Sequence, residues 1–142
     1  MRTTRDVRTP ADPQDFESLY DRPASPPLDF RVESGLGGIV CTFKFKEFSG
    51  VPERTPTVGY RAYFVPLSVG TVEQMGTPQR RKAALNLGRL CCSVPTSGKG
   101  EWITLSYPDY TTVTGGWFLA VGVNRRGVES EPTLAFPSPF NP

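Results

Sequence analysis

Two segments near the start of the chain alternate between apolar and polar residues. From residue 28 to 33, Leu28, Phe30 and Val32 alternate with charged residues. From residue 39 to 46 the alternating apolar residues are Ile39, Cys41, Phe43 and Phe45. A period of two residues places the apolar side chains of an extended segment on one face. Each segment therefore predicts a β-strand with one buried face.

Four later segments have the length and the composition of strands, being rich in β-branched and aromatic residues. They are 58–65, 101–107, 117–123 and 128–136. Pro66 and Pro108 end the first two, and the nearly continuous apolar run of the third is typical of a central strand buried on both faces. Asn124-Arg125-Arg126-Gly127 indicates a hairpin before the last segment, where Pro132 favours a position at a sheet edge.

The segment from 77 to 94 is open to two interpretations. Thr77 resembles a helix cap, Pro78 suits the first helical position, and Gly88 suits the end of a helix, so residues 78–87 fit a short helix. Residues 85–94 also fit a strand. Both interpretations hold in part if a short helix leads directly into a strand.

The 142 residues are enough for one domain with a single core. Residues 1–27 contain five prolines and no period that would bury a face, which predicts an extended proline-rich N-terminal arm. Residues 28–136 carry the strand pattern, and the proline-rich residues 137–142 form a C-terminal tail. The fold class that follows is an all-β antiparallel sandwich with an extended arm at each end.

A resemblance to a known family covers roughly residues 28 to 136. The stretch WFLAVGVNRRGVESEP, residues 117–132, resembles the last hairpin of fibronectin type III domains, and Gly59-Tyr60-Arg61-Ala62-Tyr63 resembles their third strand. Phe43 or Phe45 stands where the family usually keeps a tryptophan. The resemblance implies an immunoglobulin/fibronectin type III-like β-sandwich that serves recognition or spacing. The connection from Pro66 to Gly100 is longer than is usual in the family.

Charge does not direct the chain to nucleic acid or to a membrane. Sixteen basic and 14 acidic residues leave a net charge of +2, and no stretch approaches the roughly 20 apolar residues of a membrane span. The basic clusters Arg80-Arg81-Lys82 and Arg125-Arg126 are interpreted as solvated surface. No apolar run follows the basic N-terminal residues, so we expect synthesis in the host cytoplasm without a signal peptide.

The residue types needed for common enzyme chemistry are missing or scattered. There is no histidine, and the three cysteines are expected to be reduced. Cys41 and one of the adjacent pair Cys91 and Cys92 suit core positions better than redox work. No glycine motif has the spacing of a phosphate-binding loop. Four carboxylates, at Glu101, Asp109, Glu129 and Glu131, have no diagnostic spacing for glycan cleavage or for calcium. We therefore predict a protein that is not an enzyme and has no cofactor or metal.

The expected function is that of a virion structural protein, as in a bacteriophage head-decoration, head-tail connector or tail accessory subunit. The hypothesis would explain three features of the chain, namely a single sandwich, reduced cysteines, and proline-rich arms that neighbouring subunits would hold in place. Its partners are other virion proteins or copies of itself in an oligomeric assembly. The candidate partner-binding residues are Phe16, Leu19, Tyr20, Tyr110 and Phe140. The alternative is a carbohydrate- or surface-binding accessory module.

Overall fold

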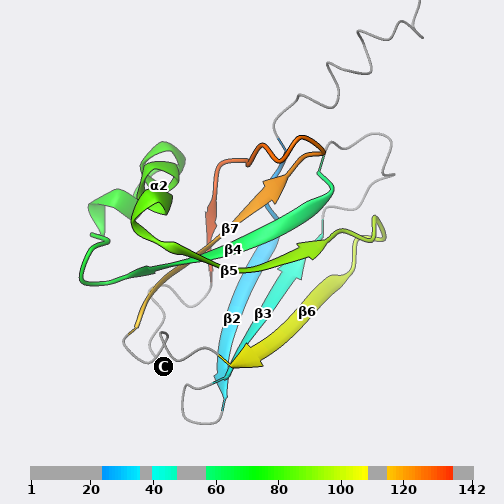
Figure 1. Cartoon of the computed structure of the whole chain (residues 1–142), viewed down its shortest axis with the longest axis horizontal. Coiled ribbons are helices and arrows are strands. Elements are labelled where there is room, and N and C mark those ends of the chain that lie inside the picture. The colour runs from blue at the N-terminus through cyan, green and yellow to red at the C-terminus, as the bar shows by residue number, and fades with distance from the viewer. Residues whose placement is uncertain (1–23, 36–39, 48–56, 109–114, 136–142) are drawn as a thin grey trace, which may run out of the picture.

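A computed structural model describes residues 24–35, 40–47, 57–108 and 115–135. Within these ranges the chain forms two antiparallel sheets, with strand orders β2-β3-β6 and β5-β4-β7-β8. The strands are β2 (Asp29–Gly35), β3 (Val40–Lys46), β4 (Gly59–Pro66), β5 (Arg89–Pro95), β6 (Trp102–Pro108), β7 (Gly116–Val123) and β8 (Thr133–Leu134). The two sheets lie face to face as layers (Figure 1). The predicted sandwich of the immunoglobulin/fibronectin type III kind is confirmed.

The core lies between the layers and is dominated by aromatic rings. Phe43 and Phe45 of β3 are fully buried, as the alternation predicts, and they face Phe118 and Tyr60 across the interior. The Phe45 and Tyr60 rings stack with centroids 5.9 Å apart, and the Phe43 ring meets Phe118 edge to face at 5.4 Å. Burying each such side chain stabilises the fold by roughly 1.5–3 kcal/mol.

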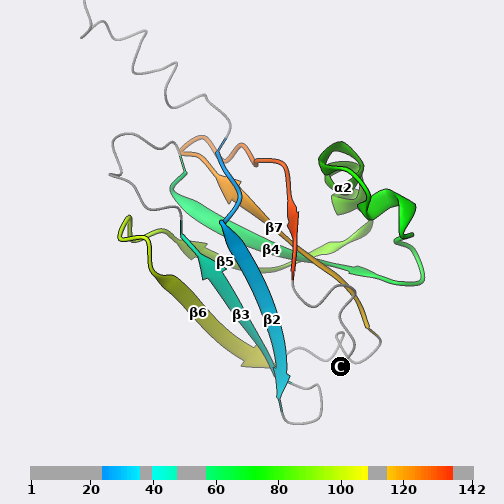
Figure 2. The same cartoon turned by 180° about the vertical axis from the view of Figure 1, so that it is seen from behind.

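The connection between β4 and β5 contains the helix α2 (Pro78–Ala84), preceded by the 3₁₀ turn η3 (Glu73–Met75) and followed by η4 (Leu85–Leu87). Both interpretations of this segment are correct in part, because the helix leads into β5. The Thr77 hydroxyl caps α2 by accepting a hydrogen bond from the Arg80 amide at 3.2 Å. The helix lies on the side of the four-stranded sheet that faces away from β2, β3 and β6 (Figures 1 and 2).

Two details differ from the expectation. Leu28 was expected to share the buried face of Phe30 and Val32, but it precedes β2 at a bend and its side chain is 59% exposed. The last strand was expected over 128–136, but only Thr133–Leu134 pairs as β8, with one further bridge from Glu129 to Val123. Pro132 has no N–H to donate, and this explains part of the shortening.

The segment just before β2 packs on the sandwich. Ala24 is buried, and the Ser25 amide donates to the Thr57 hydroxyl at 2.8 Å. The Ser25 carbonyl passes so close to Gly122 of β7 that a Cβ on that glycine would lie 1.9 Å from the oxygen. Residues 24–27, which the sequence assigns to the arm, therefore cover one end of β7.

Candidate functional site

The partner-binding residues expected from the sequence, Phe16, Leu19, Tyr20, Tyr110 and Phe140, all lie outside the described residues. They stay predictions. Two other surfaces of the described part have features that a binding module could use. One lies between the outer strands of the two sheets, and the other lies between α2 and the segment before β8.

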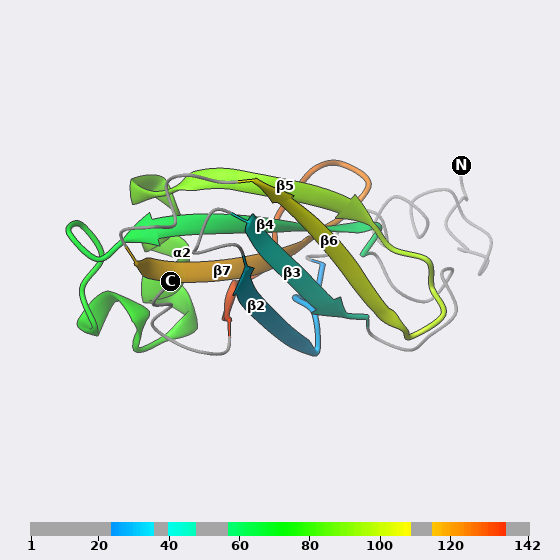
Figure 3. The same ribbon diagram turned by 90° about the horizontal axis from the view of Figure 1, so that it is seen from below.

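The first surface is the side of the sandwich where β5 and β6 are the outermost described strands of their sheets. Figure 3 shows these two strands joined by the turn at residues 96–101. We call this surface the open side and define it by Cys91 and Cys92 of β5 and Ile103 and Leu105 of β6. All four side chains pack against the main core yet are only partly buried. The core therefore reaches the solvent at the open side.

Trp102, at the start of β6, lies on the same side of the strand as Thr104 and Ser106, which is the outer face of the three-stranded sheet next to the open side. Its side chain is 44% exposed, and the Arg31 guanidinium lies 6.0 Å from the centre of its ring. A half-exposed tryptophan on a sheet face is a residue type that is enriched in protein contact surfaces.

A buried carboxylate holds the turn that joins β5 and β6. Glu47 is 1% exposed, and its side chain accepts hydrogen bonds from the Ser97 amide, from the Ser97 hydroxyl at 2.6 Å and from the Gly98 amide at 3.3 Å. Burial by itself would raise the pKa of Glu47, but these hydrogen bonds together outweigh it and lower the pKa below the usual 4.5. An ionised Glu47 therefore fixes the turn, and with it the relative positions of the two outer strands.

The second surface is built on the outer face of the four-stranded sheet. Residues of β4 and β7 that point away from the main core form a second apolar cluster with α2. The cluster consists of Val65, Met75, Ala84, Trp117 and Leu119. The Trp117 indole N–H donates to the Gly70 carbonyl at 3.1 Å. Burial of these apolar side chains holds the long connection after β4 on the outer face of the sheet.

Two basic residues of α2 tie the helix to the segment before β8. The Arg81 guanidinium donates to the carbonyls of Met75 at 2.9 Å and of Pro132 at 3.2 Å, and the Lys82 ammonium donates to the Glu129 carbonyl at 2.9 Å. The interpretation of Arg80-Arg81-Lys82 as solvated surface is therefore incomplete, because Arg81 is partly buried and both of these side chains bind backbone carbonyls.

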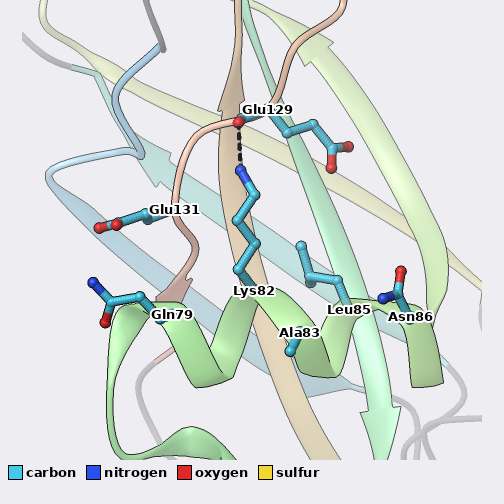
Figure 4. Close-up of a pocket in the computed structure, with 7 residues that line it drawn as sticks. All are labelled: Gln79, Lys82, Ala83, Leu85, Asn86, Glu129 and Glu131. Atoms are coloured by element: carbon cyan, nitrogen blue, oxygen red, sulfur yellow. Dashed lines mark hydrogen bonds between the residues drawn. The ribbon is translucent and has the colours of Figure 1, made fainter.

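Between α2 and this segment lies a cavity of about 390 Å³, which we call the helix pocket. It is lined by Gln79, Lys82, Ala83, Leu85, Asn86, Glu129 and Glu131. In Figure 4, Lys82 reaches across the middle, Glu131 and Gln79 lie on one side of it, and the Glu129 carboxylate, Leu85 and Asn86 lie on the other.

The carboxylate of Glu129 is held from the sheet side. Its Oε2 accepts from the Arg61 guanidinium at 3.0 Å and from the Tyr63 hydroxyl. The hydrogen bond to Glu129 raises the pKa of Arg61, whereas burial first and then the bond to Glu129 raise the pKa of Tyr63 to about 12. The Glu129 side chain thus accepts from two residues of β4 and forms an ion pair with one of them, Arg61.

Of the carboxylates considered from the sequence, Glu129 and Glu131 both line the helix pocket, Glu101 lies beside the turn before β6, and Asp109 is outside the described residues. Within the described ranges, no three histidine, cysteine, aspartate or glutamate residues gather in a way that could hold a metal ion. No described helix is long and apolar enough to cross a membrane. The sequence signal for the pocket was the pair of carboxylates, but nothing in their spacing pointed to Arg61 or Tyr63.

Comparisons with known proteins assign no family to this chain. No protein-family model matches the sequence, and no curated protein matches it. Among solved structures, the fn3 domain of the human collagen alpha-1(XX) chain in solution is 19% identical, with 86% of this chain and 90% of that chain covered and a TM-score of 0.45. The strand order of the two sheets, and not this likeness, defines the fold as a sandwich.

Proposed function

We propose that this protein is a non-enzymatic structural protein of a virion, in the class of bacteriophage head-decoration, head-tail connector or tail accessory subunits. It acts through contacts between subunits. The observation that supports this proposal most directly is the open side, where Cys91, Cys92, Ile103 and Leu105 extend the core to the surface. Trp102 of the same strand is half exposed on the adjoining outer face of the sheet. Partners are other virion proteins or copies of the chain.

The physical reason lies in the apolar area that the open side leaves in water. Covering such area on association is favourable by roughly 25 cal/mol per Å². Trp102, on the adjoining face of the same strand, is the kind of aromatic anchor that dominates contact energies. A sandwich whose outer strands hold exposed apolar groups is suited to assembly. The ordered turn held by Glu47 keeps that surface in one shape before a partner arrives.

The first test is the mass of the purified chain over a range of concentrations, measured by sedimentation velocity. We expect association that weakens in Trp102→Ala and is unchanged in the control Val72→Ala, whose side chain is 75% exposed on the far connection. The virion assignment is tested separately, by mass spectrometry of particles purified from the source of the chain. Absence of the protein from those particles contradicts the virion assignment.

The helix pocket favours a second candidate function, a carbohydrate- or surface-binding accessory module. Its lining combines amides, carboxylates and an ammonium with the apolar Ala83 and Leu85, and its volume of about 390 Å³ lies within the usual range of ligand pockets. Such mixed donors and acceptors suit a neutral, hydroxyl-rich ligand. Amide chemical shifts recorded during titration with neutral saccharides test it: Asn86→Ala should abolish shifts around α2, whereas Val72→Ala should not.

A further inference from the structure

We propose that two copies of this chain associate through β6, which pairs antiparallel with β6 of the second copy and joins their three-stranded sheets into one continuous sheet. This inference rests on the proposed function, because it names the partner that covers the open side. It is argued from the four outermost strands of the two described sheets, which are β2, β6, β5 and β8.

Three of these strands have the features with which proteins protect an edge from pairing with another chain. Within β2, Asp29, Arg31 and Glu33 are charged. Strand β8 is only two residues long and follows Pro132. Strand β5 begins at Arg89, ends at Pro95, and its register with β4 shifts at a bulge. Charges, proline, bulges and short length each disfavour strand addition.

Strand β6 has almost none of this protection. Its seven residues, WITLSYP, carry no charge, and proline appears only at the last position. Tryptophan, isoleucine, threonine and tyrosine all favour strands, so the segment has the composition that pairs readily with another strand. An exposed strand of this kind is a hazard for a protein that works alone, and it is expected where a partner strand covers it.

A second β6 fits this edge better than a charged segment does. Antiparallel pairing of β6 with itself places no like charges opposite one another within the strand. Ile103 and Leu105 lie on the core side of β6, opposite Phe45 and Phe43 of β3. The same two residues of a second copy would lie beside them and continue the apolar interior across the contact.

The solvent side of β6 is equally suited to self-pairing. Thr104 and Ser106 are exposed there, and the Ser106 hydroxyl already forms a hydrogen bond of 2.7 Å with the hydroxyl of Thr42 on β3. Hydroxyl pairs across strands are stabilising, and a second β6 would add more of them. The net charge of +2 for each chain opposes the approach of two copies only weakly.

The test introduces one charge on the solvent side of β6, next to its central residue. Thr104→Glu places a carboxylate opposite Lys44 in the single subunit, where it is tolerated, but brings two carboxylates together in the pair. We expect the dimer Kd measured by sedimentation to rise at least about tenfold, since like charges brought together across two paired strands are destabilising. The urea midpoint of the single subunit should stay as in the unaltered chain.

The matched control is Ser68→Glu, which adds the same charge at an exposed residue after β4 and should leave the Kd unchanged. Hydrogen exchange gives an independent readout, because pairing should protect β6 amides at high protein concentration only. If Thr104→Glu associates as tightly as the unaltered chain, β6 pairing is overturned, while the association itself still supports subunit contacts. A chain that stays monomeric yet occurs in purified particles also overturns β6 pairing without removing the proposed function.

Discussion

At the scale of single residues, Glu47 is the side chain on which the shape of the open side depends. It is buried, it directly follows β3, and it holds the turn at Ser97 by hydrogen bonds from main chain and side chain. An ionised group in such a place is stabilising only while its donors remain. The energetic contribution of Glu47 should therefore be visible both in substitution and in the response to pH.

We predict that Glu47→Gln lowers the free energy of unfolding at neutral pH by roughly 1.5–3 kcal/mol, the usual contribution of hydrogen bonds to a charged group. Because folding lowers the pKa of Glu47 below 4.5, its stabilisation is complete above that pH and is lost as the pH falls through the folded-state pKa. Urea unfolding between neutral and acid pH checks both statements. The variant should lose less stability in acid than the unaltered chain. If the free energy of unfolding falls with pH equally in both, Glu47 is not the group responsible.

Tyr63 is predicted to titrate late. Burial and the hydrogen bond to Glu129 raise its pKa from 10.0 to about 12, so the folded protein disfavours the phenolate. Its stabilisation is fully present below pH 10.0 and is lost as the pH rises toward about 12. An ultraviolet titration of the five tyrosines should show a late step that disappears in Tyr63→Phe. A variant with the same late step would assign it to another tyrosine.

Neither Glu47 nor Tyr63, which binds Glu129, could be predicted from the sequence as part of a site, because their partners are remote along the chain. Glu47 meets Ser97 across 50 positions, and Glu129 meets Arg61 across 68 positions. Spacing along a sequence reports on periods within an element and on short turns, but not on which loops of two layers meet. The carboxylate of Glu129 could be noticed as a candidate, whereas the arginine that balances it could not.

At the scale of elements, the local sequence pattern was sufficient to predict a helix or strand where the whole element has the same surroundings. The apolar run of β7 was predicted to be buried on both faces, and every residue of Gly116–Val123 is buried. The cap at Thr77 and the proline at 78 marked the start of α2 correctly. The last strand was predicted too long because the Gly122 amide of β7 bonds to a side chain there. It donates to the Ser130 hydroxyl at 2.8 Å and not to a backbone carbonyl, so the regular strand pairing is interrupted.

Gly122 is where the segment before β2 crosses β7, and we predict that Gly122→Ala disrupts this crossing. The added Cβ would lie 1.9 Å from the Ser25 carbonyl oxygen, which is backbone and has little room to move. We expect a loss of about 1–3 kcal/mol in the free energy of unfolding, typical of overpacking. Gly76→Ala is the milder comparison: its Cβ would lie 3.2 Å from the Glu73 carbonyl oxygen, a tight contact that a shift of a few tenths of an ångström relieves, and its φ is −78°. Equal stability of the two variants would show that residues 24–27 can move away from the added methyl group with no loss of stability.

At the scale of the whole molecule, the two sheets differ in how far their outer faces are covered by other parts of the chain. The outer face of the four-stranded sheet is covered in part by α2 and its apolar cluster. The three-stranded sheet has no such cover in the described residues, and its outer face carries the ion pair of Lys44 with Glu33 at 2.9 Å. For the proposed association, contact through a face of either sheet is therefore less favourable than contact through the edge at β6, where the core itself approaches the solvent.

This asymmetry leads to a prediction about salt. Association through β6 brings together uncharged strands and apolar side chains, so its Kd should change less than about threefold between roughly 0.05 M and 0.5 M salt, because screening acts only on charges. Association through the basic cluster Arg125-Arg126, which is exposed at the turn after β7, would instead weaken strongly over the same range. Sedimentation at several salt concentrations distinguishes the two routes. A strong salt dependence that Arg126→Gln abolishes would move the contact from the edge of the three-stranded sheet to the turn at Arg126.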